Sequence, residues 1–162
     1  ELNNLKQMTV SLGIAKQVHF LGFRTDIREL LAASDVFVLT SLQEGLPRST
    51  MEAMASGLPC VASKIRGNVD LIENGKGGFL CNPYNADHFA KAIQSSTVAK
   101  RRSFCHNNLL TIKKFDVETL LPFSRHDFTN VNAGSTPPMH SATAVTSSSL
   151  RISLKSLVSL SR

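Results

Sequence analysis

Two glutamates separated by seven residues are the side chains whose types and spacing point most clearly to chemistry. Glu44 lies in a polar loop over residues 41–48, and Glu52 lies near the start of a helix predicted over residues 49–56. Carboxylates hydrogen-bond to sugar hydroxyls, whereas the unpaired amides and the dipole of a helix start attract phosphate. A ligand with a diphosphate between two hydroxyl-bearing rings would satisfy these features, and a nucleotide sugar is the common metabolite of that shape.

The same residues also have purely structural interpretations. Ser49 and Glu52 have the S-x-x-E spacing of a capping box, which begins many helices that have no function of their own. Glu44 could be a solvated loop residue, and Gly45 with Pro47 could form only a turn. The helices and strands predicted around the loop distinguish the functional from the structural interpretation.

Strands and helices alternate around this loop. Apolar runs predict strands over residues 18–23, 36–40, 59–63 and 79–81. Helices are predicted over residues 49–56, 85–95 and 98–115, the last of them weakened by Asn107 and Asn108. Two further helices are predicted to begin at caps, one at Asp26, where Glu29 completes a capping box, and one at Asn68. The pattern predicts an α/β fold with a Rossmann-like, doubly wound parallel sheet. Ligands of such sheets bind outside the carboxyl ends of the strands, where the loop 41–48 lies.

The chain divides into three parts. Residues 1–17 are expected to be a truncated lead-in, because the chain begins without an initiator methionine, and residues 18–121 form the nucleotide-sugar-binding, Rossmann-like domain. Residues 122–162 read as a low-complexity tail rich in serine and threonine, which we expect to be disordered. A reading-frame slip or a false gene end would produce the same composition. Within the tail, Leu150, Ile152 and Leu154 alternate with polar residues.

Net charge and cysteine content limit which binding partners and which cellular compartment are expected. The net charge of +6 suits a ligand that carries phosphate, although much of the excess is expected on solvated helix faces: Lys91, Lys100, Arg101, Arg102, Lys113 and Lys114. A nucleic-acid partner is disfavoured because basic and aromatic residues are not interleaved. Cys60 and Cys81 lie in apolar runs and are predicted to be buried, reduced thiols. We therefore predict a cytoplasmic protein, with peripheral contact at the inner face of the membrane left open.

Several consecutive motifs resemble one enzyme family. They are Phe20-Leu-Gly-Phe, Asp35-Val-Phe-Val-Leu-Thr-Ser, Glu44-Gly-Leu-Pro, the run from Glu52-Ala-Met-Ala to Ser63, and Gly78-Phe-Leu with Asn82-Pro83. Together they are similar to family 4 (group 1) of the retaining glycosyltransferases, in the C-terminal donor-binding domain of the GT-B fold. The resemblance covers about residues 18–95, so the chain resembles a fragment of such an enzyme.

The resemblance implies roles for individual residues. Glu44 would be the catalytic carboxylate that bonds hydroxyls of the transferred sugar, and Glu52 would hold the ribose hydroxyls. The remaining donor-binding residues would be the backbone of Gly45 and Leu46 along the sugar, the amides of Arg48, Ser49 and Thr50 at the diphosphate, and Arg24 near the nucleobase. No protein-bound metal or other cofactor is expected, because no D-x-D run occurs and the five histidines are scattered.

The resemblance also implies partners. The donor would be a UDP- or GDP-linked sugar, and the acceptor a carbohydrate or lipid-linked molecule bound by a missing N-terminal domain or a partner chain. Members of this family usually also supply an arginine and a lysine to the diphosphate from a segment before this one. Neither is visible here, so we expect the chain alone to be inactive or nearly so. A non-catalytic nucleotide-binding remnant, or a partner subunit of a split glycosyltransferase, has the same motifs and stays open. The G-x-G-x-x-G and G-x-x-x-x-G-K-[ST] fingerprints are absent, which excludes a dinucleotide-binding oxidoreductase and a P-loop hydrolase.

Overall fold

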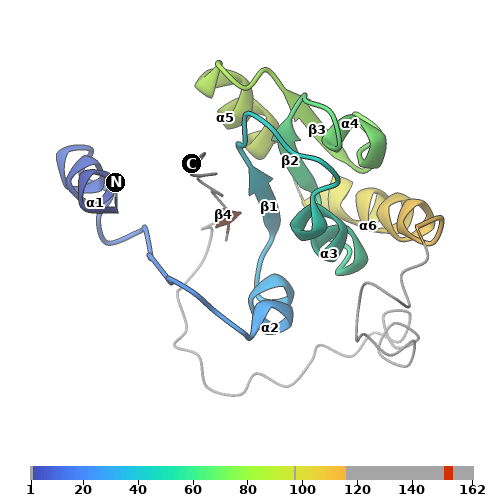
Figure 1. The fold of residues 1–162 in the computed structure, drawn as a ribbon, viewed down its shortest axis with the longest axis horizontal. Coiled ribbons are helices and arrows are strands. Elements are labelled where there is room, and N and C mark those ends of the chain that lie inside the picture. The colour runs from blue at the N-terminus through green and yellow to red at the C-terminus, as the bar shows by residue number, and fades with distance from the viewer. Residues whose placement is uncertain (1, 97, 116–151, 155–162) are drawn as a thin grey trace.

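The centre of the molecule is a four-stranded parallel sheet (Figure 1), described by a computed structural model over residues 2–96, 98–115 and 152–154. The strands are β1 (Val36–Leu39), β2 (Cys60–Ser63), β3 (Gly78–Cys81) and β4 (Ile152–Leu154), in the order β3-β2-β1-β4. The helices are α1 (Leu2–Ser11), α2 (Ile27–Ala32), α3 (Arg48–Ala55), α4 (Asn68–Leu71), α5 (Ala86–Ser95) and α6 (Val98–Ile112). The predicted α/β class and parallel sheet are confirmed.

Helices cover both faces of the sheet. Phe37 and Leu39 of β1 pack on one face with Met54 of α3, in a cluster that also includes buried residues of α2, α4 and α6. Val36 and Val38 belong to a second cluster, together with residues of α5. Successive residues of a strand point to opposite faces, so a strand between two helix layers is apolar at every position. This explains why β1 and β2 could be recognised in the sequence.

The strand predicted over residues 18–23 is wrong. These residues adopt no regular element, and Phe23 is 94% exposed. A strand forms only where a neighbouring strand completes its hydrogen bonds, and β1 already pairs with β2 on one side and β4 on the other. β1 therefore offers this apolar run no free edge.

Residues Ile152–Leu154 depart from the expectation of a tail without structure. They pair in parallel with β1, with Val36 opposite Ile152 and Val38 opposite Leu154. In the sequence, Leu150, Ile152 and Leu154 alternate with polar residues. The rest of the predicted tail, and the end of the predicted domain after residue 115, lie outside the described residues.

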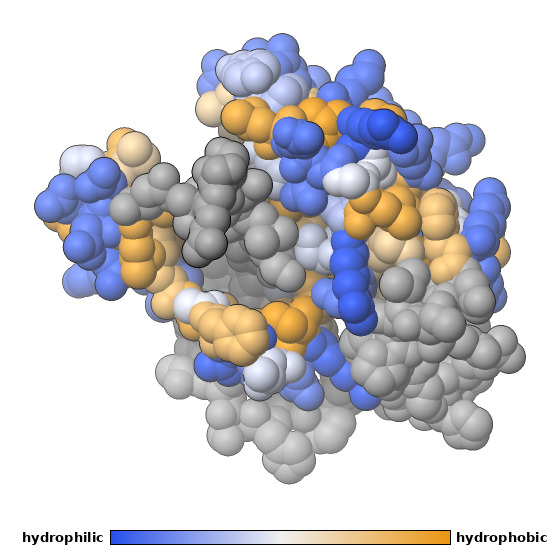
Figure 2. Space-filling model, in the orientation of Figure 1, coloured by the Kyte–Doolittle hydropathy of each residue, from blue (hydrophilic) through white to orange (hydrophobic). Residues whose placement is uncertain are grey.

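Hydrophobic side chains are exposed at the amino-terminal end of the described chain. None of the residues of α1 is buried, and α1 stands apart from the sheet in Figure 1. Large exposed hydrophobic residues occur on α1 and along the segment leading to α2: Leu2, Leu5, Met8, Val10, Leu12, Phe20, Leu21 and Phe23. Figure 2 shows orange, hydrophobic surface over this part of the molecule. Residues before α2 therefore contribute little to the core.

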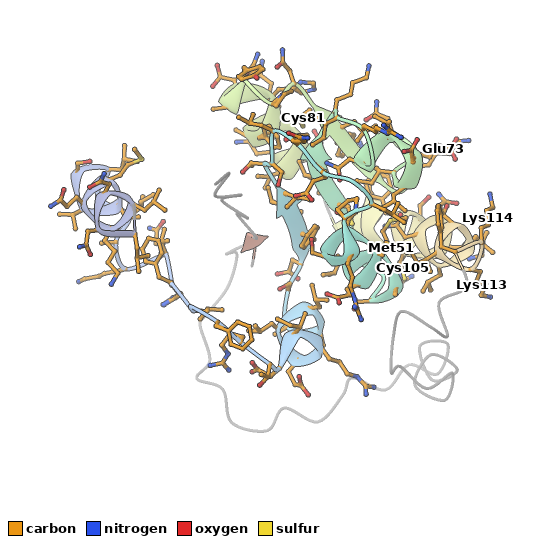
Figure 3. The ribbon with its side chains drawn as sticks, in the orientation of Figure 1. Met51, Glu73, Cys81, Cys105, Lys113 and Lys114 are labelled. Carbon is orange, nitrogen blue, oxygen red and sulfur yellow. The ribbon has the colours of Figure 1, made fainter. Side chains whose placement is uncertain are left out.

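The basic residues lie on solvated surfaces, as expected. Lys91, Lys100 and Arg102 are exposed, and Lys100 lies over the ring of Phe79 with 5.4 Å between its Nζ and the ring centroid. Lys113 and Lys114 extend from the outer end of α6 in Figure 3. The side chain of Arg101 is outside the described part of the structure.

The thiols of Cys60 and Cys81 are free and buried, which confirms that prediction. Burial disfavours the thiolate, so it raises the pKa of Cys60 well above its ordinary value and that of Cys81 to about 11. Both side chains therefore act as small, protonated hydrophobes in the sheet.

Asn108 anchors α6 to the loops that precede β2 and β3. Its Nδ2 donates to the carbonyl oxygens of Leu58 and Gly77, both at 2.8 Å, and its side chain is buried. The asparagines that weaken α6 by propensity thus stabilise it through tertiary contacts. Neighbouring Asn107 makes a single, more exposed bond to the carbonyl oxygen of Lys76 at 3.0 Å.

We expect Asn108→Ala to lower the free energy of unfolding by about 2 kcal/mol, because two buried hydrogen bonds are lost together. Both carbonyls keep a longer bond, from Cys60 Sγ at 3.4 Å and Cys60 N–H at 3.3 Å, which limits the loss. Urea unfolding followed by circular dichroism measures the change, with Asn107→Ala as the matched control, expected within about 0.5 kcal/mol of wild type. Equal losses in the two variants would contradict the anchoring role of Asn108.

Candidate functional site

A hollow of about 590 Å³ lies where β1 and β2 end. It is lined by residues of the loop after β1 and of the segment after β2: Gln43, Glu44, Gly45, Leu46, Arg66 and Asp70. The carboxyl ends of neighbouring parallel strands meet at one edge of a sheet, which brings these two segments together. Three of the predicted donor-binding residues, Glu44, Gly45 and Leu46, therefore share one wall.

The carboxylate of Glu44 is oriented by its own loop. Ser41 Oγ donates a hydrogen bond to Glu44 Oε1 at 2.6 Å, and both residues are half-buried. The bond occupies part of the acceptor capacity of one oxygen and restricts the rotamers of the side chain. A carboxylate held in this way at the edge of a hollow can accept further hydrogen bonds from ligand hydroxyls.

Gly67 holds the two loops together. It has φ +84° and ψ −51°, close to the geometry of the rare, strained γ-turn, and its α-carbon faces the loop after β1. A Cβ at this position would lie 1.8 Å from the carbonyl oxygen of Gly45 and 3.1 Å from Pro47 Cδ. The backbone N–H of Gly67 donates to Asp70 Oδ2 at 3.3 Å. Only glycine permits this approach, which sets the width of the hollow.

The start of α3 differs from the capping-box interpretation. The helix begins at Arg48 with Pro47 as its N-cap, and no side chain caps it. A capping box pairs the N-cap residue with the third residue of the helix, and Ser49 is the second residue of α3, so Ser49 and Glu52 do not form one. Glu52 instead lies 3.4 Å from Arg48 Nε, with side chains 20% and 65% exposed respectively.

The amides at the start of α3 are also partly used. The N–H groups of Thr50 and Met51 donate to the carbonyl oxygen of Pro47 at 3.0 and 3.2 Å. The expectation of unpaired amides at this helix start is therefore wrong for these two residues, because the carbonyl of the N-cap residue Pro47 accepts the first hydrogen bonds of the helix. The N–H of Thr50 can contact a phosphate only if it also keeps its bond to the carbonyl of Pro47. Ser49 comes one residue before the two bonded amides.

Arg24 is not among the residues that line the hollow. Its guanidinium forms an ion pair with Asp26, including an Nε–Oδ1 bond of 2.7 Å. That hydrogen bond and the charge of Asp26 raise the pKa of Arg24, and the bond from Arg24 lowers the pKa of Asp26. Asp26 is the N-cap residue of α2, but its side chain makes no capping bond, so the predicted capping box with Glu29 is wrong. The carboxylate is engaged by Arg24 instead.

Buried polar residues surround the same edge of the sheet. Thr50, Ser63 and Asn68 are fully buried, at the start of α3, the end of β2 and the start of α4. Asn68 Nδ2 donates to the carbonyl oxygen of Ser63 at 2.9 Å, so Asn68 braces the segment after β2 and is not the N-cap that the sequence predicted. Hydroxyls and amides at a buried edge make this end of the sheet polar.

Sequence reasoning missed Gln43 in the loop after β1 and the wall formed after β2. Gln43, Arg66 and Asp70 line the hollow, but none was a candidate. The available signal was position, because Arg66 and Asp70 closely follow the apolar run 59–63 and therefore come from the carboxyl end of a strand. Their proximity to Glu44 depends on the packing of Gly67.

Within the described part of the chain, no group of three or more His, Cys, Asp or Glu side chains is arranged to hold a metal ion. No helix among the same residues is long and apolar enough to cross a bilayer.

The chain is similar to known glycosyltransferases in sequence. Over 93 residues it is 43% identical to the UDP-Gal:alpha-D-GlcNAc-diphosphoundecaprenol alpha-1,3-galactosyltransferase of Escherichia coli, a match of 57% of this chain and 24% of the relative. It is 35% identical over 94 residues to the lipopolysaccharide core biosynthesis glycosyltransferase LpsE of Rhizobium meliloti, with 58% and 28% covered. The chain thus spans about a quarter of the length of these relatives.

The fold is similar to a solved structure and the sequence to a family model. The structure of Anabaena Alr3699/HepE in complex with UDP and glucose matches with a TM-score of 0.66 and 34% identity, covering 74% of this chain and 34% of that one. The family model described as glycosyl transferases group 1 matches residues 1–100. The match covers more than half of the 162 residues of this chain, which therefore belongs to the group 1 glycosyl transferases.

Proposed function

We propose that the chain supplies the donor-binding half of a glycosyltransferase that moves a sugar from a nucleotide sugar to an acceptor such as a growing polysaccharide or a glycolipid. The observation that carries this proposal is the hollow at the ends of β1 and β2, where Ser41 orients Glu44 next to the start of α3. The carboxylate can bind sugar hydroxyls and the adjacent helix start can bind phosphate, and a nucleotide sugar contains both groups.

The proposed roles are those that the family resemblance implies, and the lining of the hollow supports those of Glu44, Gly45 and Leu46. Glu44 bonds hydroxyls of the transferred sugar and stabilises it during transfer, while Gly45 and Leu46 line the sugar. Glu52, which is 20% exposed and only loosely paired with exposed Arg48, turns to the ribose hydroxyls. The amides at Arg48, Ser49 and Thr50 contact the diphosphate, that of Thr50 by sharing its bond to Pro47, and the role of Arg24 at the nucleobase stays a prediction because Arg24 does not line the hollow. Helix amides would stabilise the negative charge that develops on the diphosphate as the glycosidic bond breaks.

Similar proteins support the ligand class. The Anabaena structure was solved with UDP and glucose, and the name of the E. coli relative gives a UDP-linked donor and a lipid-linked acceptor. We propose a UDP- or GDP-linked donor, retention of configuration, and an acceptor site on an N-terminal domain or a partner chain. Action in the cytoplasm, with contact at the membrane surface, belongs to the same proposal.

The proposal is tested by titrating the folded chain with UDP and with GDP, followed by heteronuclear NMR, which detects weak binding. We expect one nucleotide to bind, and we expect Glu52→Ala to weaken that binding about 10- to 100-fold, as for a lost hydrogen bond to a charged group. Glu29→Ala removes an equal charge from the exposed surface of α2 and is expected to leave binding unchanged.

Two outcomes would contradict the proposal. A folded wild-type chain that binds neither nucleotide would reject a donor site in this chain. Equal binding by Glu52→Ala and Glu29→Ala would reject the ribose role of Glu52 while leaving the site itself in place. Repeating the titration with EDTA tests the prediction that no bound metal is required.

A further inference from the structure

The charges that line the hollow are unbalanced for a phosphate ligand. Of its six lining residues, Glu44 and Asp70 are anionic and Arg66 is the only cation. A nucleoside diphosphate brings at least two further negative charges, so the two carboxylates repel it unless a nearby cation offsets them. Arg66 is the lining residue that can do so.

The backbone at Arg66 is held close to the start of α3. The next residue, Gly67, packs against the carbonyl oxygen of Gly45 and against Pro47, which is the N-cap of α3. Its N–H also bonds to Asp70, which limits movement of the turn. Arg66 is therefore anchored one residue from the contact with the phosphate-attracting helix start, while its exposed side chain is able to reach into the hollow.

We propose that Arg66 binds the diphosphate of the donor and offsets the charge of Glu44 and Asp70. This inference rests on the proposed donor site and adds to it a residue from the segment after β2. The planar guanidinium donates two parallel hydrogen bonds to phosphate oxygens, which lysine cannot reproduce. It also stabilises the leaving diphosphate, whose charge increases during transfer.

The test compares UDP with uridine, which has no phosphate, by NMR titration of the full chain. We expect Arg66→Ala to weaken UDP binding about tenfold and to leave uridine binding unchanged, with Arg66→Lys between the two. Arg102→Ala, at an exposed position on α6, removes the same charge and is expected to bind UDP as the wild type does. Raising the salt concentration should reduce the difference between wild type and Arg66→Ala.

The outcomes separate this inference from the function on which it rests. Wild-type binding of UDP with equal affinity in Arg66→Ala and Arg102→Ala would overturn the role of Arg66 and leave the donor site intact. Equal weakening of UDP and uridine would also overturn it, since that result means a contact with the nucleoside. A wild-type chain that binds neither UDP nor GDP would overturn both the donor site and this inference.

Discussion

Replacing Gly67 with alanine is expected to lower the free energy of unfolding by about 3–5 kcal/mol. An L residue is strained at φ +84°, and the added Cβ would lie 1.8 Å from the carbonyl oxygen of Gly45, a backbone atom that cannot rotate away. The overlap can be relieved only by separating the loop after β1 from the segment after β2. The hollow would then widen, and Glu44 would move relative to Arg66.

Urea unfolding measures the loss of stability, and NMR titration with UDP measures the effect on the site. Gly45→Ala is the control for stability, because a Cβ at Gly45 meets nothing within 4 Å and its φ is not in the left-handed region. We expect that control to change the free energy of unfolding by less than about 1 kcal/mol. If Gly67→Ala is as stable as Gly45→Ala, the contact between the two loops does not determine the geometry of the site.

Alanine at Gly78 should be the second strongly destabilising change, at about 3 kcal/mol or more. Gly78 begins β3 opposite Cys60, and a Cβ there would lie 1.8 Å from the carbonyl oxygen of Cys60 and 2.9 Å from its nitrogen. Strands in a sheet are about 4.8 Å apart, so a side chain directed at the neighbouring backbone forces the ladder open. β3 is an edge strand whose pairing with β2 covers the core residues Val61 and Cys81.

Amide hydrogen exchange distinguishes local opening from a general loss of stability in Gly78→Ala. We expect the amides of β2 and β3 to exchange faster than those of α3, in addition to a lower urea midpoint. Gly45→Ala again serves as the control. Uniform acceleration throughout the protein, with no preference for β2 and β3, would show that pairing at Gly78 is not the origin of the effect.

The elements predicted most accurately from the sequence are those with a strong local pattern. Strands β1 and β2 are apolar at nearly every position, and α3 is followed by Gly57 and Pro59, which end it. A strand that is buried on both faces accepts only apolar residues, so it can be recognised from the sequence without a structure. The run 18–23 shows the limit of such patterns, because an apolar run forms a strand only where a neighbouring strand pairs with it, and both sides of β1 are already paired.

Within the site, the sequence identified one wall and the structure added the other. Glu44, Gly45 and Leu46 were recognised because they are adjacent in a motif between a strand and a helix. Arg66 and Asp70 lie about 20 residues further along the chain, and no local pattern connects them to Glu44. The capping box at Asp26 failed because Arg24 engages its carboxylate, and the one at Ser49 failed because the helix begins one residue earlier, at Arg48.

By itself, the sequence determined the α/β class, the parallel strands, the burial of Cys60 and Cys81, and the loop that carries Glu44. These follow from periodicity and from turn residues, which act over a few positions and need no knowledge of the rest of the chain. Tertiary structure alone decided that Asn108 anchors α6, that β4 pairs with β1, and that Gly67 brings Arg66 to the hollow. Each of these depends on close contact between segments distant in sequence, and such contacts arise from packing that local residue patterns do not encode.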